Sequence, residues 1–219
     1  MKQIDFIFDF ISPYAYLAFK QLDTLEASLG IQVKMVPVLF AGLLNAHGNL
    51  GPAEVPAKRS HVIRDALRKA QRLRLSLAVP PAHPFNPLLA LRLVLAAETV
   101  GLQREVIASL FDAVWGQGAA IDRAESCSAL LADLQGDLLL EAAGSDSVKL
   151  KLRSNTDQAV ANGVFGVPTF VVDGELFWGV DSVPLLIQFL TVGDQFDQDL
   201  VQRWDSLPAA ANRSRPTNK

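Results

Sequence analysis

The stretch Asp9-Phe10-Ile11-Ser12-Pro13-Tyr14-Ala15-Tyr16 follows an apolar run at residues 4–8, and it predicts that a strand ends here and a helix begins. Pro13 suits the first helical position, because its ring fixes a helical φ and its missing N–H would have no partner there. Ser12 then becomes the N-cap, beside the positive end of the helix dipole and free backbone N–H groups. Such a position stabilises an anion such as a thiolate, although taken alone the pattern is that of a plain capping serine.

The apolar spacing on both sides of this motif predicts a β-α-β unit. Residues 3–9 alternate as a strand does, and residues 13–29 carry apolar side chains at helical spacing up to a C-capping Gly30. Residues 31–38 then return to a period of two. Strands joined in this way are expected to be parallel, with a right-handed crossover.

Strand character returns near the C-terminus. Residues 169–172 and 175–178 are predicted strands, and the Asp173-Gly174 pair between them is a two-residue hairpin signal. A last helix is expected from about 182 to 191. The resulting order, β-α-β followed by β-β-α, is that of the thioredoxin fold in the α/β class.

The region between residues 41 and 166 has no strand signal of comparable strength. A loop rich in Gly, Asn and Pro is expected over residues 45–57. Helical segments are expected at residues 56–76, 86–101, 103–116, 123–133, 137–143 and 146–162. We therefore expect a thioredoxin-like domain from residues 1–40 and 163–204, a large all-helical insertion over 41–162, and a mobile polar tail over 205–219.

Composition narrows the function classes. Half of the 219 residues are apolar, which allows a large core, and the net charge of −3 gives no general attraction to nucleic acid or to an anionic membrane. Charges interrupt every apolar stretch well short of the roughly 18 residues that span a membrane. No basic segment followed by an apolar one opens the chain, so we expect a cytoplasmic protein. The single cysteine, Cys127, has no disulfide partner and no neighbours at metal-ligand spacing, and it is interpreted as a small core residue.

A second motif, Gly163-Val164-Phe165-Gly166-Val167-Pro168-Thr169-Phe170, lies just before the third predicted strand. Pro168 cannot donate to a sheet, and an X-Pro bond in a tight turn is where cis bonds occur. A cis bond would leave the N–H and C=O of Val167 facing outward, free to pair with a short peptide. The alternative is a trans proline that marks the start of a strand, and only the combination with Ser12-Pro13 favours the cis form.

The chain resembles the glutathione transferase kappa class and its bacterial relatives, the 2-hydroxychromene-2-carboxylate isomerases. These are thioredoxin folds with a helical insertion, related to the bacterial disulfide oxidases. The resemblance covers roughly residues 3–191 and rests on four motifs in the same order, which are residues 9–16, residues 48–52 with 55–58, residues 163–170, and residues 177–182.

The resemblance implies a glutathione site. Ser12 would hydrogen-bond the glutathione thiolate and lower its pKa. Val167 would pair with the peptide backbone beside a cis Pro168. Asp181 would hold the γ-glutamyl ammonium, and Ser182 would hold its carboxylate through its hydroxyl and N–H. Family members often carry Arg at the position of Ser182, so this chain departs from the pattern there.

Further residues of the implied site come from the insertion and its neighbours. Asn49 and Lys58 match residues that contact glutathione in the kappa class, although Asn49 also fits a plain turn and Lys58 belongs to a basic, solvated helix. Tyr14, His47 and Asn86 are candidates for the substrate pocket. For His47 the alternative is a surface histidine, and for Asn86 it is a cap on the next helix.

The resemblance implies a glutathione-dependent enzyme of the isomerase branch, because the Phe177-Trp178-Gly179 form of the last motif is typical of it. The expected reaction converts 2-hydroxychromene-2-carboxylate to trans-o-hydroxybenzylidenepyruvate by reversible thiolate addition. The alternatives are a kappa-like transferase that conjugates glutathione to electrophiles, and a binding module without activity on the same scaffold. Dithiol chemistry is excluded, because Ser12-Pro13-Tyr14-Ala15 replaces the Cys-x-x-Cys that it needs. The expected partners are a small aromatic carboxylate and a second copy of the chain in a homodimer, with the insertion at its interface.

Overall fold

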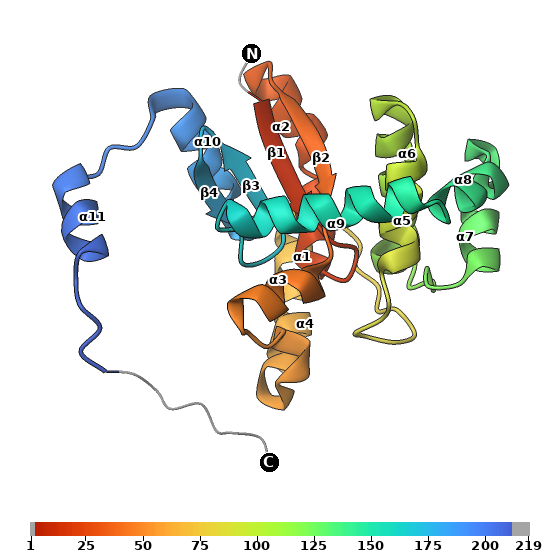
Figure 1. The fold of residues 1–219 in the computed structure, drawn as a ribbon, viewed down its shortest axis with the longest axis horizontal. Helices are drawn as coiled ribbons and strands as arrows, with labels where there is room; N and C mark the ends of the chain where they lie inside the picture. The colour runs from red at the N-terminus through yellow and green to blue at the C-terminus, as the bar shows by residue number, and fades with distance from the viewer. Residues whose placement is uncertain (1–2, 212–219) are drawn as a thin grey trace.

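A four-stranded mixed sheet lies at the centre of the computed structural model, which describes residues 3–211 (Figure 1). Its strands are β1 (Gln3–Phe8), β2 (Gln32–Pro37), β3 (Thr169–Val172) and β4 (Glu175–Trp178), in the spatial order β2-β1-β3-β4. β1 pairs in parallel with β2 and antiparallel with β3, and β4 pairs antiparallel with β3. The predicted β-α-β unit and C-terminal hairpin are confirmed, and so is the thioredoxin fold with a helical insertion.

The hairpin turn follows from its two central residues. Asp173 and Gly174 both have positive φ, 52° and 89°, as a two-residue turn of type I′ requires. Aspartate tolerates this conformation better than most residues, and glycine adopts it without steric cost.

The connection between β1 and β2 contains two helices where one was predicted. They are α1 (Pro13–Phe19) and α2 (Leu22–Leu29), and Gly30 ends α2 at φ 64° as expected. The side chain of Gln21 donates a 3.0 Å hydrogen bond to the carbonyl of Leu17, which in a continuous helix would accept from the Gln21 N–H. That N–H instead bonds to Ala18, so the helix unwinds at this point.

The regular structure of the insertion is all helical, and most of its predicted segments are present. Its longer helices are α3 (Phe40–His47), α4 (Pro56–Leu73), α5 (Leu88–Ala96), α6 (Val100–Phe111), α7 (Ala124–Leu130), α8 (Gly136–Ala143) and α9 (Asp146–Ala161). Its short turns are η1 (Pro52–Glu54), η2 (Asp112–Gly116), which extends α6 as a π-helical turn, and η3 (Ala132–Leu134).

Several boundaries within the insertion differ from the sequence prediction by a few residues, and two of the differences have a clear local cause. The expected loop at 45–57 starts late, because α3 continues through His47 and ends at Gly48 with φ 61°. The expected helix at 86–101 stops at Ala96, because Thr99 caps α6 by accepting a hydrogen bond from Leu102 N.

The C-terminal part contains one helix that the sequence reading missed. After η4 (Val180–Ser182) and α10 (Val183–Val192), the helix α11 (Gln198–Asp205) begins at Asp197, whose carboxylate accepts from Asp199 N. Figure 1 shows α11 apart from the sheet. The predicted mobile tail begins where α11 ends, and residues 212–219 of it lie outside the described part of the chain.

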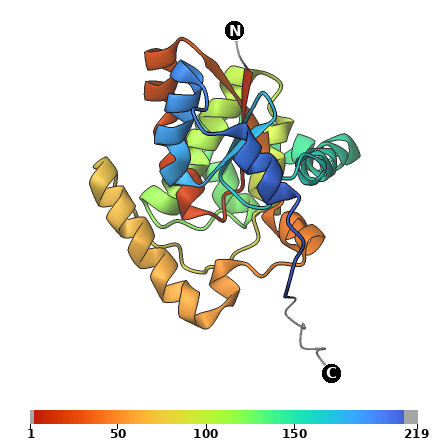
Figure 2. The ribbon, with the colours of Figure 1, turned by 90° about the vertical axis from the view of Figure 1, so that its left-hand side faces the viewer.

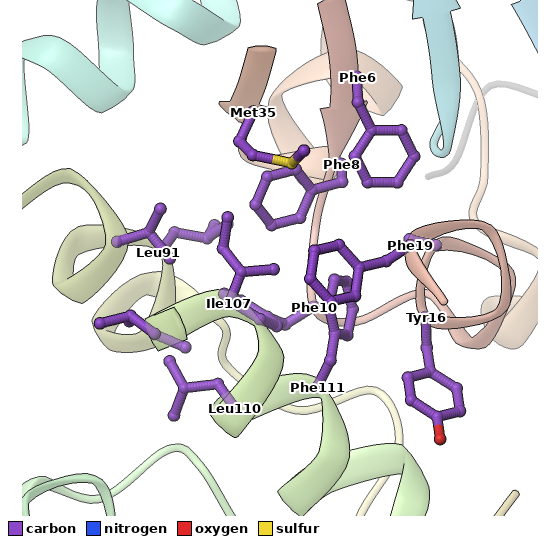
Figure 3. Close-up of a cluster of buried hydrophobic side chains, with 14 of the residues drawn as sticks. Phe6, Phe8, Phe10, Tyr16, Phe19, Met35, Leu91, Ile107, Leu110 and Phe111 are labelled. Atoms are coloured by element: carbon purple, nitrogen blue, oxygen red, sulfur yellow. The ribbon is translucent and has the colours of Figure 1, made fainter. Parts of the chain in front are cut away.

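One aromatic core joins the sheet to the insertion (Figure 3). Phe6 and Phe8 of β1 stack at 5.5 Å, and Phe10, just beyond the strand, meets Phe111 of α6 at 4.6 Å. These side chains are fully buried. Burial of a phenylalanine side chain contributes about 1.5–3 kcal/mol, so the insertion is held firmly against the end of β1.

The other face of the sheet has a smaller core. Ile7, Val36 and Val38 pack there against Leu43 of α3 and Ala159 of α9. In Figure 2, α4 runs along the outside of the molecule on the side opposite α9. Within residues 3–211, no helix has both the length and the apolar character needed to cross a membrane.

Candidate active site

Ser12 caps the first helix, as its position before Pro13 predicted. Its Oγ accepts a 3.2 Å hydrogen bond from Ala15 N, and its own φ and ψ are extended. The residue is 8% exposed, so a small part of it remains accessible at the N-terminus of α1. A buried hydroxyl beside helical N–H groups can donate to an anion and stabilise it.

The loop before β3 meets Ser12 from the far end of the sequence. The Val167-Pro168 peptide bond is cis, as predicted, and Ser12 Oγ donates to the carbonyl oxygen of Val167 at 3.4 Å across 155 residues of sequence. The carbonyl of Val167, expected to be free to pair with a peptide, thus already accepts from the capping serine and keeps one lone pair for a second donor. The N–H of Val167 makes no hydrogen bond within residues 3–211, which fits the predicted pairing with a peptide.

Asp9 anchors the loop of residues 9–12, here called the Ser12 loop. The sequence alone assigns no role to Asp9. Its side chain is fully buried and accepts hydrogen bonds from Ile11 N at 3.1 Å and Phe40 N at 2.8 Å. Burial raises the pKa of Asp9 to about 7, and the backbone donors Phe40, Ile11 and Phe10 oppose the rise. One carboxyl group thus ties the loop to the first helix of the insertion.

Two insertion residues hold the same loop from the other side. The indole of Trp115 donates a 2.7 Å hydrogen bond to Phe10 O, and His83 Nε2 lies 2.9 Å from Ile11 O. The His83 and Trp115 rings lie edge to face at 5.6 Å. Burial lowers the pKa of His83, the Ile11 hydrogen bond opposes this, and the charge of Arg59 adds to the lowering. The neutral imidazole therefore donates to Ile11.

Helix α4 packs against α1 beside the site. Tyr14 donates to Asp65 Oδ2 at 2.8 Å and lies 3.4 Å from the carbonyl of Val62. Lys69 pairs with the same carboxylate and lies over the Tyr14 ring. Burial raises the pKa of Tyr14, and the hydrogen bond to Asp65 and the charges of Asp65 and Asp181 raise it further. Tyr14 is therefore a neutral hydroxyl that links the two helices.

The last motif, residues 177–182, runs from the end of β4 into η4, and η4 contacts α1. Asp181 is exposed and close enough to Tyr14 to act on its pKa. Ser182 directs its hydroxyl to Gly179 O at 2.7 Å, so its proton is already donated within the chain. The N–H of Gly179 bonds to Pro168 O at 2.8 Å, which fixes this turn beside the cis proline.

The remaining predicted site residues are more scattered. Lys58 is exposed in the first turn of α4 and has no ion pair within residues 3–211, and Asn49 is exposed just after α3. His47 is helical rather than in a loop, and its Nε2 lies 3.0 Å from Val164 O. Asn86 accepts from Leu88 N, which is the capping alternative.

The cysteine takes no part in this site. Cys127 is fully buried on α7, its Sγ donates to Ile121 O, and burial raises its pKa to about 11. Its interpretation as a core residue is confirmed, because a thiol of this kind carries almost no thiolate near neutral pH.

Comparison with known proteins places this geometry in a family. A family model described as a DsbA-like thioredoxin domain matches residues 3–191. The chain belongs to this DsbA-like family. A 2-hydroxychromene-2-carboxylate isomerase of Sphingobium xenophagum is 30% identical over 194 residues, covering 86% of this chain and 98% of that protein. The glutathione S-transferase kappa 1 of Rattus norvegicus is 28% identical over 205 residues, covering 86% of this chain and 91% of that protein.

A solved structure supports the same fold. The structure of a 2-hydroxychromene-2-carboxylate isomerase matches with a TM-score of 0.80 at 24% sequence identity, covering 94% of this chain and 100% of that one. Within the DsbA-like family, this chain has a serine at the N-terminus of its first helix and no second thiol. It cannot form an internal disulfide, so dithiol exchange within one chain is not available to it.

Proposed function

We propose that the protein is a glutathione-dependent isomerase that converts 2-hydroxychromene-2-carboxylate to trans-o-hydroxybenzylidenepyruvate. The observation that carries the proposal is the contact between Ser12 and Val167, which brings a helix N-terminus and the edge of the cis-proline loop together. The relatives named as isomerases, with 30% identity over most of the chain, direct the proposal to this reaction.

The chain's own groups fit the sulfur and the backbone of glutathione. Ser12 would turn its hydroxyl proton from the long contact with Val167 O to the thiolate, and the end of α1 would stabilise the negative charge, so that the bound thiol ionises more easily. The unpaired N–H of Val167 would donate to the cysteinyl carbonyl, while Pro168 shapes the edge. When bound, glutathione would supply a thiolate that adds to the substrate and leaves again after rotation about a carbon–carbon bond.

The charged ends of glutathione would be bound by residues around this centre. Asp181 is exposed on η4 and would pair with the γ-glutamyl ammonium. Ser182 would offer its N-terminal position on α10 to the γ-glutamyl carboxylate, although its hydroxyl proton already bonds to Gly179. Lys58 and Asn49 would contact the tripeptide from the insertion. We keep Tyr14, His47 and Asn86 as the proposed substrate wall.

A kappa-like transferase is the second candidate, and the 28% identity to the rat kappa enzyme favours it. Both activities need the same ionised sulfur, so the residues described above serve either one. The product separates them, because the isomerase returns free glutathione and the transferase consumes it. We further propose that the protein acts as a homodimer, with the insertion contributing to the interface.

The proposal is tested by mixing the full chain with glutathione and 2-hydroxychromene-2-carboxylate and following the ultraviolet spectrum. We expect conversion that requires glutathione but does not consume it, and a large loss of rate in Ser12→Ala. Ser28→Ala is the matched control, because its hydroxyl bonds to Leu25 O on α2, away from the site. Turnover without glutathione, or full activity in Ser12→Ala, would overturn the scheme.

A further inference from the structure

Arg59 carries a positive charge that no carboxylate of the described residues neutralises. It lies in the first turns of α4, it is exposed, and no ion pair joins it to an acidic residue within residues 3–211. Its Nη2 donates a 3.0 Å hydrogen bond to the carbonyl of His83. By contrast, Lys69 on the same helix pairs with Asp65. A guanidinium has five N–H donors, so a single carbonyl partner orients Arg59 and leaves most of its donors free.

His83 brings this guanidinium to the Ser12 loop. The residue whose carbonyl accepts from Arg59 is the one whose ring bonds to Ile11 O, and Ile11 directly precedes Ser12. Arg59 also lies one helical turn before Val62, whose carbonyl contacts the Tyr14 hydroxyl. Arg59 is therefore on the part of α4 that meets α1 at the helix N-terminus.

Arg59 is charged, and the residue that it contacts, His83, is not. Burial and the nearby guanidinium lower the pKa of His83, so the imidazole is neutral near pH 7. Asp65, a carboxylate on the same helix, is already bound by Tyr14 and Lys69. An anion that approaches the Ser12 loop from α4 thus meets an oriented, unneutralised cation.

We propose that Arg59 binds the carboxylate of the second substrate, so that the site selects anionic aromatic electrophiles over neutral ones. The inference rests on the proposed function, because it assumes that the electrophile approaches a thiolate at Ser12. The planar fork of Arg matches a carboxylate with two parallel hydrogen bonds, which Lys cannot reproduce. Lys58, the neighbouring cation, is left to glutathione.

The first test compares an anionic electrophile with its neutral methyl ester, and the effect of each variant on the ratio of the two rates isolates the role of the carboxylate. In 4-chloro-3,5-dinitrobenzoate and its methyl ester, the glutathione thiolate forms a C–S bond at the ring carbon and chloride leaves with the C–Cl electron pair. We expect Arg59→Gln to lower kcat/KM about tenfold for the carboxylate and less than about twofold for the ester. Arg59→Lys is expected to lie between wild type and Arg59→Gln for the carboxylate.

Arg72→Gln is the matched control, because it removes the same charge from the last turn of the same helix. It should leave the ratio of the two kcat/KM values unchanged. If Arg59→Gln lowers kcat/KM equally for both electrophiles, Arg59 acts only by holding the backbone at His83, and the proposal is wrong. Wild-type kcat/KM values for both electrophiles in Arg59→Gln would overturn it as well.

A binding measurement separates this proposal from the proposed function. Calorimetric titration with 3,5-dinitrobenzoate, which lacks the leaving group, should show a Kd about tenfold higher in Arg59→Gln than in wild type. Titration with glutathione alone should give the same Kd in both. If glutathione does not bind but the benzoate depends on Arg59, the anion site stands and the proposed function fails. If Arg59→Gln weakens glutathione instead, Arg59 belongs to the glutathione site and the proposal is wrong.

Discussion

The indole N–H of Trp115 donates a 2.7 Å hydrogen bond to the carbonyl oxygen of Phe10, 105 residues away in the sequence. Phe10 also packs on Phe111 at 4.6 Å, so a polar and an apolar contact from the insertion meet at one residue of the Ser12 loop. The insertion therefore does more than cover the sheet. It determines where the loop after β1 lies, and with it the direction in which the Ser12 hydroxyl points.

Replacing Trp115 with Phe should destabilise the protein and loosen the Ser12 loop. The ring is 2% exposed, so the change leaves the Phe10 carbonyl buried without a donor and also opens a small cavity. We expect a loss of about 2–4 kcal/mol in the free energy of unfolding, measured by urea denaturation. Trp204→Phe is the control, since Trp204 is 75% exposed, and it should change stability by less than about 0.5 kcal/mol. Equal effects in the two variants would contradict this role of Trp115.

Asp9 should make stability fall as the pH rises from about 4 to about 7. Its folded pKa of about 7 lies above the unfolded value near 3.8, so in this range the native state binds more proton than the unfolded chain. The contribution of Asp9 to the free energy of unfolding is therefore fully present below about pH 4 and is lost as the pH rises through 7. In Asp9→Asn this dependence should be absent, and urea denaturation between pH 4 and 8 measures it.

The difference in unfolding free energy between the wild type and Asp9→Asn should be largest near pH 4, because burial does not penalise the protonated carboxyl. At neutral pH the gap should narrow, because ionisation in the buried site destabilises only the wild type. Asp199→Asn, an exposed residue of α11, is the control and should follow the wild type. A gap that stays constant over this range would show that Asp9 does not titrate with a raised pKa.

The parts of the fold that the sequence predicted are those with local signals. Pro13 after Ser12, Gly30 at the end of α2 and the Asp173-Gly174 turn each depend on the conformations open to one or two residues, and all three are as expected. Where a side chain competed with the backbone, the prediction failed. Gln21 interrupts a helix and Thr99 starts a new one, and neither event changes the apolar spacing.

The sequence predicted only part of the candidate site, because several of its residues depend on tertiary contacts and not on a local motif. Ser12 and Val167 were found because each lies in a motif of its own. Asp9 lies in the first motif, but no local signal gave it a role, because its burial depends on tertiary packing. His83 lies in none of the four motifs, and its contact with Ile11 spans 72 residues. Arg59 belongs to the same basic helix as Lys58, and only its hydrogen bond to the carbonyl of His83 distinguishes it from the other cations there.

The thiol of bound glutathione should have a higher pKa in Ser12→Ala than in the wild type. The hydroxyl is the side-chain donor at the end of α1, and loss of a hydrogen bond to a charged acceptor costs about 1.5–3 kcal/mol, or about 1 to 2 pKa units. Thiolate absorbance near 240 nm, titrated with pH in the complex, measures the shift. Ser145→Ala is the control, since Ser145 caps α9 through Val148 N far from the site. Both variants should lose the roughly 0.5–2 kcal/mol of a helix cap, but only Ser12→Ala should move the thiol pKa.

A methyl group at position 166 should disturb the cis-proline loop through Trp178. A Cβ built on Gly166 would lie 2.5 Å from Trp178 Nε1, closer than real Cβ contacts allow, so the indole or the loop must shift. We expect Gly166→Ala to cost about 1–3 kcal/mol in unfolding free energy and to weaken glutathione binding through Val167. Because Trp178 is 56% exposed, Trp178→Ala should itself cost little and should remove the clash. The double variant Gly166→Ala/Trp178→Ala should therefore be more stable than Gly166→Ala alone, and simple additivity of the two single changes would contradict this steric account.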